Sequence, residues 1–79
     1  MDDEITFVDA SGLKCPLPVL KARKALQSLT DGDKIRVIST DPASPLDFKH
    51  FCKSKGHSLL SIEEKKESFE FVIVKSCGQ

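Results

Sequence analysis

The residues of this chain that could do chemistry most readily form the run Cys15-Pro16-Leu17-Pro18. A helical pattern of apolar and basic residues follows this run as far as Leu29. Proline fits the first turn of a helix well, because the amide hydrogen that it lacks would have no partner inside the helix there. The spacing therefore predicts that Cys15 caps a helix in which Pro16 is the first residue and Pro18 the third.

A thiol at the N-terminal end of a helix can be unusually reactive. The positive end of the helix dipole favours the thiolate, which is the nucleophilic form of cysteine. Lys14 adds a positive charge next to Cys15. Because Pro16 and Pro18 have no amide hydrogen, few donors remain for the sulfur, and we expect only a modest lowering of the Cys15 pKa. A reactive thiol is thus the first functional hypothesis, set against the simpler interpretation of an ordinary helix cap.

The other two cysteines have different expected roles. Pro18 occupies the place of the second cysteine in a Cys-x-x-Cys pair, which disfavours dithiol chemistry at Cys15. Cys52 lies on the apolar side of a second helical segment and is expected to be a small buried hydrophobic residue. Cys77 lies close to the C-terminus and is expected to be exposed. Pairing of Cys77 with Cys15 in a disulfide stays an open alternative.

No metal site and no cofactor are expected. The chain contains only two histidines, His50 and His57, and three cysteines, at irregular spacing. Structural zinc sites need four such ligands at characteristic intervals. The histidines are therefore expected to be surface or capping residues.

Size and charge restrict the class of protein. Seventy-nine residues suit a single domain over residues 1–79, with a small core. Twelve basic and twelve acidic residues give no net charge, which argues against direct nucleic-acid binding. No apolar stretch has the length of a membrane span, and Asp2, Asp3 and Glu4 do not fit a signal peptide. We therefore expect a cytoplasmic protein without structural disulfides, because thiols stay reduced in that compartment.

The apolar pattern predicts six elements in the order β-α-β-α-β-β. The expected strands are 5–9, 35–38, 59–62 and 69–74, and the expected helices are 15–29 and a segment between Ser44 and Gly56. Ser44 is the expected cap of the second helix, and Gly56 ends it. The order predicts an α/β fold of the α+β two-layer sandwich type: a four-stranded mixed sheet with both helices on one face. The last strand is apolar on both faces, so we place it inside the sheet or in an association surface.

Four basic residues accompany the cysteine in sequence: Lys14, Lys21, Arg23 and Lys24. They are expected to attract acidic partner surfaces, although a solvated helix face is the simpler interpretation. Gly12 shapes the turn before the helix, since glycine readily adopts a positive φ. Pro16 and Pro18 are the other residues expected to shape the site around Cys15.

Taken together, these residues resemble the TusA/SirA family over essentially the whole chain. The segments that carry the resemblance are Asp9-Ala10-x-Gly12-Leu13-Lys14-Cys15-Pro16-x-Pro18-Val19, Arg23-Lys24, Thr40-Asp41-Pro42-Ala43, Asp47, Phe51-Cys52 and Gly56-His57-x-Leu59. The resemblance implies a fold like the C-terminal domain of translation initiation factor three. It also implies a sulfur-carrier protein, or sulfurtransferase, in which Cys15 holds a persulfide.

The resemblance also implies protein partners. These are a cysteine desulfurase or rhodanese-like sulfur donor and a downstream sulfur-relay acceptor, and a carrier that docks on them is expected to be a monomer. Members that act in tRNA thiolation have a glutamate between the two prolines, where this chain has Leu17. The pathway therefore stays open between tRNA thiolation, sulfur oxidation, cofactor sulfuration and selenium metabolism.

Two other functions stay open. A non-catalytic regulatory or RNA-binding module would share the translation-factor-like fold, but the zero net charge and the five aromatic residues give it little support. A redox protein would pair Cys15 with Cys77. Replacing each cysteine in turn would distinguish these functions from sulfur transfer.

Overall fold

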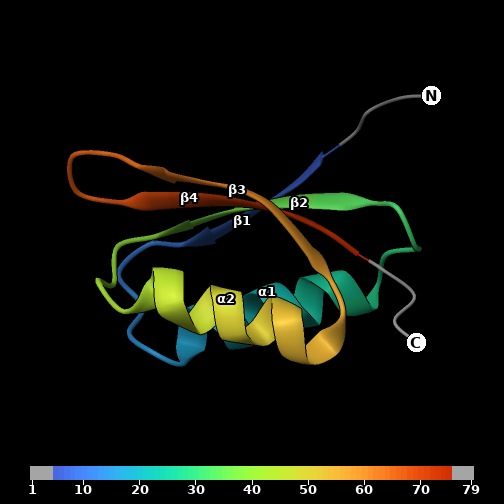
Figure 1. Cartoon of the computed structure of the whole chain (residues 1–79). Coiled ribbons are helices and arrows are strands. Elements are labelled where there is room, and N and C mark those ends of the chain that lie inside the picture. Colours follow the sequence, from blue (N-terminus) through green and yellow to red (C-terminus); the bar gives the residue numbers. More distant parts are fainter. Residues whose placement is uncertain (1–4, 76–79) are drawn as a thin grey trace.

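The structure, a computed structural model, describes residues 5–75, which form one sheet with two helices on one side (Figure 1). Along the chain the elements are β1 (Ile5–Ala10), α1 (Leu17–Gln27), β2 (Lys34–Ser39), α2 (Ser44–Lys55), β3 (Ser58–Glu64) and β4 (Phe69–Val74). The predicted order and the α+β two-layer class are confirmed. No helix within residues 5–75 is long and apolar enough to cross a membrane.

The sheet is mixed and has the strand order β1-β2-β4-β3. β1 is parallel to β2, while β4 pairs antiparallel with both β2 and β3. The prediction that the apolar last strand lies inside the sheet is confirmed. Because β1 and β2 are parallel, the loops that leave their carboxyl ends lie at the same edge of the sheet, and these are the loops that position the site.

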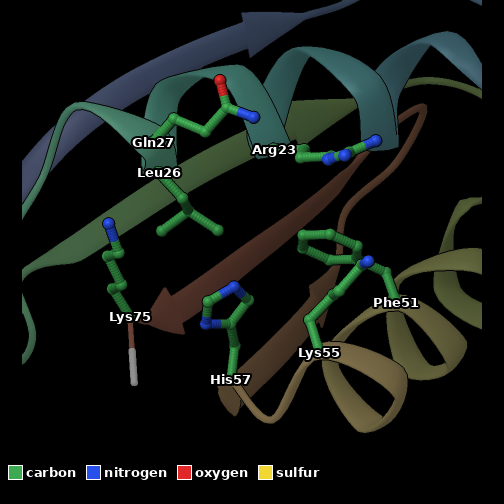
Figure 2. Close-up of a pocket in the computed structure, with 7 residues that line it drawn as sticks. All are labelled: Arg23, Leu26, Gln27, Phe51, Lys55, His57 and Lys75. Atoms are coloured by element: carbon green, nitrogen blue, oxygen red, sulfur yellow. The ribbon is translucent and has the colours of Figure 1, made fainter. Parts of the chain in front are cut away.

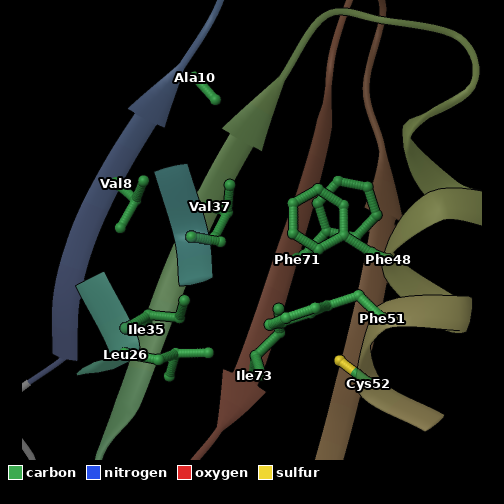
Figure 3. Close-up of a cluster of buried hydrophobic side chains, with 11 residues drawn as sticks. Val8, Ala10, Leu26, Ile35, Val37, Phe48, Phe51, Cys52, Phe71 and Ile73 are labelled. Atoms are coloured by element: carbon green, nitrogen blue, oxygen red, sulfur yellow. The ribbon is translucent and has the colours of Figure 1, made fainter. Parts of the chain in front are cut away.

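The core fills the space between the helices and the covered face of the sheet (Figure 3). Its buried apolar residues are Val8, Ala10, Ala22, Leu26, Ile35, Val37, Phe48, Phe51, Cys52, Phe71 and Ile73. The rings of Phe48 in α2 and Phe71 in β4 stack with their centroids 4.4 Å apart. This contact joins the second helix to the interior strand, which explains why both residues are fully buried.

Within residues 5–75, no helix covers the other face of the sheet. In β1 the inward side chains are Val8 and Ala10, whereas Phe7 lies on the uncovered face and is 57% exposed. Glu70 of β4 forms ion pairs with Arg36 at 3.1 Å and with Lys65 at 3.2 Å. The alternation in the sequence thus predicted the strand, but it did not show which of its sides the helices cover.

The first helix begins later than predicted. Its first residue is Leu17 and its N-cap is Pro16, whose φ of −98° and ψ of 16° are not helical. The Leu17 amide donates to the Lys14 carbonyl at 2.8 Å and so closes a turn before the helix starts. The prediction that Cys15 caps the helix is therefore wrong, because the first helical hydrogen bond, which the Leu20 amide donates at 3.1 Å, is accepted by the carbonyl of Pro16 and not by that of Cys15. The peptide bond between Cys15 and Pro16 is cis.

The same shift changes the place of the second proline. Pro18 is the second residue of α1 rather than the third, and its side chain is buried. The helix ends at Gln27, two residues before the predicted Leu29. The apolar stripe on the inner side of this segment has Ala22 and Leu26 buried at its centre, while Val19 and Leu29 are half-buried at its two ends.

The second helix begins one residue earlier than predicted. Its N-cap is Ala43, so Ser44 is the first helical residue and not the cap. The Ser44 hydroxyl is buried and shares a 2.5 Å hydrogen bond with the Ser39 hydroxyl at the end of β2. The Ser44 side chain, which the sequence pattern assigns to capping, is therefore used in a tertiary contact instead. Gly56 ends the helix with a φ of 81°, as predicted.

Candidate functional site

Cys15 is exposed in the loop between β1 and α1. Its backbone amide donates to Oδ2 of Asp41 at 2.6 Å, and the other carboxylate oxygen of Asp41 accepts from the Ala43 amide at 3.3 Å. Asp41 belongs to the loop between β2 and α2. One carboxylate therefore ties together the two loops that leave the parallel strands, and it fixes the backbone of Cys15 at this edge of the sheet.

A second link between the same loops lies at Gly12. Its φ is 80°, in the left-handed region that glycine adopts without strain. Its amide donates to the Thr40 hydroxyl at 2.9 Å. Before it, the Ser11 amide donates to the Asp9 carboxylate at 3.0 Å, and hydrogen bonds with Ser11 lower the pKa of Asp9. The positive φ that the sequence permitted at Gly12 is present, and it turns the chain toward the cysteine.

The electrostatic surroundings of the thiol are acidic. The pKa of Cys15 is raised above its ordinary value, first by a hydrogen bond from the thiol to the Asp47 carboxylate. Desolvation and the negative charges of Asp47 and Asp41 raise it further. The predicted lowering of this pKa is therefore wrong, because the hydrogen bond to Asp47, desolvation and the charges of the two carboxylates all favour the protonated thiol. At neutral pH the protonated thiol is the favoured form.

Cys15 opens onto a groove between the two helices. Pro16 and Val19 line it from the side of α1, and the lining residues of α2 are Asp47, His50, Phe51 and Ser54. The volume of this groove is about 330 Å³. It is shallow and open, so it suits contact with another protein better than enclosure of a small substrate.

Sequence reasoning did not place three of these neighbours beside the thiol: Asp41, Asp47 and His50. The proximity of Asp41 to Cys15 could have been inferred from the sequence, because Asp41 follows β2 at the edge of the sheet where β1 also ends. Asp47 and His50 are three residues apart in α2, so both lie on the helix side that faces Cys15. The sequence does not reveal that Asp47 and His50 lie close to Cys15, because this proximity depends on how α2 packs against α1.

The predicted basic residues do not surround the thiol. Lys21 and Lys24 line a separate depression beside β1, where the Lys21 ammonium donates to the Asp9 carbonyl at 2.5 Å. Arg23 lines a third pocket near the other end of the helices. Lys14 is exposed in the same loop as Cys15. Of the four basic residues, only Lys14 is a neighbour of Cys15 along the chain. The role of all four in partner binding stays a prediction.

The remaining cysteines contribute little to this site. Cys52 is buried, and its burial raises the pKa of the thiol to about 11, so the prediction of a buried hydrophobic cysteine is confirmed. Cys77 lies outside the described residues. Within residues 5–75, no group of three or more His, Cys, Asp or Glu side chains is arranged to hold a metal ion.

The fold and the site together define a small α+β domain with an exposed, hydrogen-bonded thiol at the mouth of a groove between its helices. The chain matches the family model for sulfurtransferase TusA over residues 6–75 and belongs to that family. It is 46% identical over 69 residues to the sulfur carrier protein TusA of Allochromatium vinosum, covering 87% of this chain and 91% of the relative.

A solved structure has the same fold. The crystal structure of a SirA-like protein from Desulfitobacterium hafniense superposes with a TM-score of 0.80 at 29% sequence identity. The match covers 92% of this chain and 99% of the other. The membership in the TusA/SirA family that the sequence motifs indicated is thus confirmed, and with it the coarse role of a sulfur carrier.

Proposed function

We propose that this protein accepts sulfane sulfur as a persulfide on Cys15 and passes it to an acceptor protein. The observation that carries the proposal is the place of the Cys15 thiol, which is exposed at the mouth of a groove in a chain of the TusA family. An open groove lets a partner bring its own sulfur atom to the thiol. We take residues 1–79 as one carrier domain without a cofactor.

Loading is a transfer of neutral sulfur between two thiols. The Cys15 thiolate attacks the outer sulfur of a persulfide on the donor, and a new S–S bond forms. The S–S bond of the donor breaks, and its electron pair stays on the inner sulfur, which leaves as a thiolate. One thiolate is consumed and one is released, so the transfer needs no external oxidant or reductant.

Unloading is a second exchange of the same kind, in which Cys15 is the donor of the sulfur. An acceptor thiolate attacks the outer sulfur of the Cys15 persulfide, and the Cys15 sulfur leaves as a thiolate. Asp47 and Asp41 favour the protonated form of that sulfur, because the thiol can donate to Asp47 while the thiolate is repelled by both carboxylates. Reprotonation therefore returns the empty carrier to its stable state.

The proposed partners are proteins. A cysteine desulfurase or a rhodanese-like protein would supply the sulfur, and a relay protein with a reactive cysteine would accept it, all in the cytoplasm. Lys14, Lys21, Arg23 and Lys24 would attract acidic surfaces on these partners, an effect that added salt should weaken. We propose a monomeric carrier that binds one partner at a time.

Intact-mass spectrometry tests this function. The protein is incubated with a cysteine desulfurase and cysteine, beside the variants Cys15→Ser and Cys77→Ser. We expect the wild type and Cys77→Ser to gain the mass of one sulfur atom, which a reducing thiol removes, and Cys15→Ser to gain none. Transfer of that sulfur to a second purified thiol protein would then establish the relay.

Two results would contradict the proposal. If no competent donor adds sulfur to the wild type, Cys15 is not a carrier, and the regulatory or RNA-binding module becomes the better hypothesis. If loading requires both Cys15 and Cys77, the pair acts as a redox couple instead.

A further inference from the structure

The loop of Cys15 and the start of α2 are tied together by hydrogen bonds. The Cys15 amide donates to Oδ2 of Asp41 at 2.6 Å, and the Ser44 amide donates to the Asp41 carbonyl at 3.0 Å. Asp41 thus connects the loop of Cys15 with the first residue of α2. Asp47 lies in the first turn of that helix and lines the same groove as Cys15. The fold therefore fixes the Asp47 carboxylate beside the thiol.

The two carboxylates near Cys15 have different tasks. Both oxygens of Asp41 accept from backbone amides, those of Cys15 and Ala43. The Asp47 carboxylate instead accepts a hydrogen bond from the Cys15 thiol. Asp41 therefore holds the backbone of the cysteine, whereas Asp47 acts on the sulfur itself.

Several positive charges of the molecule lie away from the thiol. Figure 2 shows the pocket near the other end of the helices, which is lined by three basic residues: Arg23, Lys55 and Lys75. The charges that act on the Cys15 sulfur are those of Asp47 and Asp41. A negative charge on this sulfur would thus have negative neighbours.

The empty and the loaded carrier differ in charge at this point. Empty Cys15 is a thiol, because the hydrogen bond to Asp47, desolvation and the nearby carboxylates raise its pKa. A persulfide is more acidic than the corresponding thiol, so the outer sulfur of loaded Cys15 is ionised at neutral pH. An S–S bond is about 2 Å long, so this outer sulfur stays close to Asp47. Loading therefore replaces a hydrogen bond to Asp47 with a repulsion.

Loading from an ionised donor persulfide moves one negative charge onto Cys15. A bond forms between the Cys15 sulfur and the outer sulfur of the donor, and the S–S bond of the donor breaks. The electron pair of the broken bond stays on the donor's inner sulfur, which takes up the proton of the Cys15 thiol and leaves as a thiol. The negative charge passes with the outer sulfur to Cys15, and the exchange needs no external oxidant or reductant.

We propose that Asp47 lowers the affinity of Cys15 for the carried sulfur, because it stabilises the empty thiol by a hydrogen bond and repels the negative outer sulfur of the loaded form. The inference rests on the proposed function and adds a reason for release. Sulfur on Cys15 is held weakly, so it passes readily to an acceptor thiol that has no carboxylate beside it.

The exchange equilibrium with glutathione persulfide and glutathione tests the inference. Every protein in the series carries Cys77→Ser, and Cys52 is buried, so the exchange reports Cys15. Intact-mass spectrometry under anaerobic conditions gives the ratio of loaded to empty protein at a fixed ratio of persulfide to thiol. Asp47→Asn should raise this loaded ratio about tenfold, because it removes both a charged hydrogen-bond acceptor and a like charge.

A series of charges at position 47 separates this effect from damage to the fold. Asp47→Glu keeps the charge and should stay close to the parent protein, whereas Asp47→Lys should load more sulfur than Asp47→Asn. Asp31→Asn removes the same charge from the exposed turn after α1 and should leave the loaded ratio unchanged. A loaded ratio that does not follow the charge at position 47, or an equal rise in Asp31→Asn, would overturn the inference.

A neutral disulfide separates the hydrogen bond from the repulsion. In exchange with 2-hydroxyethyl disulfide and 2-mercaptoethanol, the group added to Cys15 has no charge, so only the hydrogen bond of the thiol is lost. Asp47→Asn should then raise the loaded ratio by about threefold, less than with the persulfide. Equal rises with the two reagents would contradict the repulsion and overturn the inference. If the persulfide does not load Cys15 in the parent protein, the proposed function fails, while the neutral exchange still decides whether Asp47 stabilises the empty thiol.

Discussion

The surroundings of Cys15 favour the protonated form of its thiol. A hydrogen bond to Asp47, desolvation and the charges of Asp47 and Asp41 all raise the pKa of the thiol. The hydrogen bond to Asp47 is the largest cause, because it stabilises only the protonated form. The Cys15 thiol is thus held in a form that resists alkylation and oxidation, since the thiolate is the reactive species.

Replacing Asp47 with Asn should make Cys15 more reactive. The variant removes a negative charge that raises the thiol pKa, so that pKa falls and more thiolate is present at neutral pH. The rate of alkylation by iodoacetamide should rise, and the midpoint of its pH profile should move to lower pH. The rise should be smaller than the increase in thiolate, because a less basic thiolate is a weaker nucleophile.

Peptide mapping after alkylation separates Cys15 from Cys52 and Cys77. The control is Asp31→Asn, an exposed residue of the turn after α1, which should leave the profile unchanged. A profile of Asp47→Asn identical to that of the wild type would show that Asp47 does not control the thiol.

At the scale of elements, the site depends on two loops that are joined by side-chain hydrogen bonds. Thr40 accepts from the Gly12 amide, and Asp41 accepts from the Cys15 amide. Both loops leave the carboxyl ends of parallel strands, so the sheet brings them to one edge. The cysteine is therefore held by the loop after β2 as well as by its own loop before α1.

Gly12→Ala should destabilise the protein by about 1–2 kcal/mol. A methyl group at this position would contact nothing within 4 Å, so the cost comes from forcing alanine to a φ of 80°. Urea denaturation measures the loss of unfolding free energy. Gly12→Asn is the matched control and should lose less, because asparagine adopts the left-handed region more readily. Equal losses in the two variants would argue against a conformational cause.

At the scale of the whole molecule, the sheet is covered on one face only. The core lies between this face and the helices, and Phe48 and Phe71 stack across it. Within the part of the chain that the structure describes, the opposite face is left without a helix, and Phe7 lies there. The two faces should therefore respond very differently to the loss of an aromatic ring.

Phe48→Ala should lower the free energy of unfolding by about 3–5 kcal/mol, because it opens a cavity in the core. A chain of 79 residues has a total stability of about 4–12 kcal/mol, so this loss is a large part of the whole. Phe7→Ala, at a residue 57% exposed, should cost less than about 1 kcal/mol. Similar urea midpoints for the two variants would show that the uncovered face is packed in solution.

The sequence alone determined the features that depend on local patterns. The order of the elements, the bounds of the last strand, the turn at Gly56 and the burial of Cys52 follow from apolar periodicity and from the conformational freedom of glycine. Even there, neighbouring residues limited the precision. Pro16 rather than Cys15 caps the first helix, and Ser44, whose hydroxyl is hydrogen-bonded to that of Ser39, is the first residue of the second helix and not its cap.

Only the tertiary structure decided the chemistry of the site. The protonation of Cys15 depends on Asp41 and Asp47, and Asp41 is 26 residues away along the chain. The pocket near the other end of the helices is likewise lined both by Arg23 of α1 and by Lys75, which follows β4. Electrostatic interactions depend on distance in space and on exposure to water, and neither can be read from spacing along the chain. The motif predicted Cys15 as the reactive residue, whereas the packing of α2 against α1 set its surroundings.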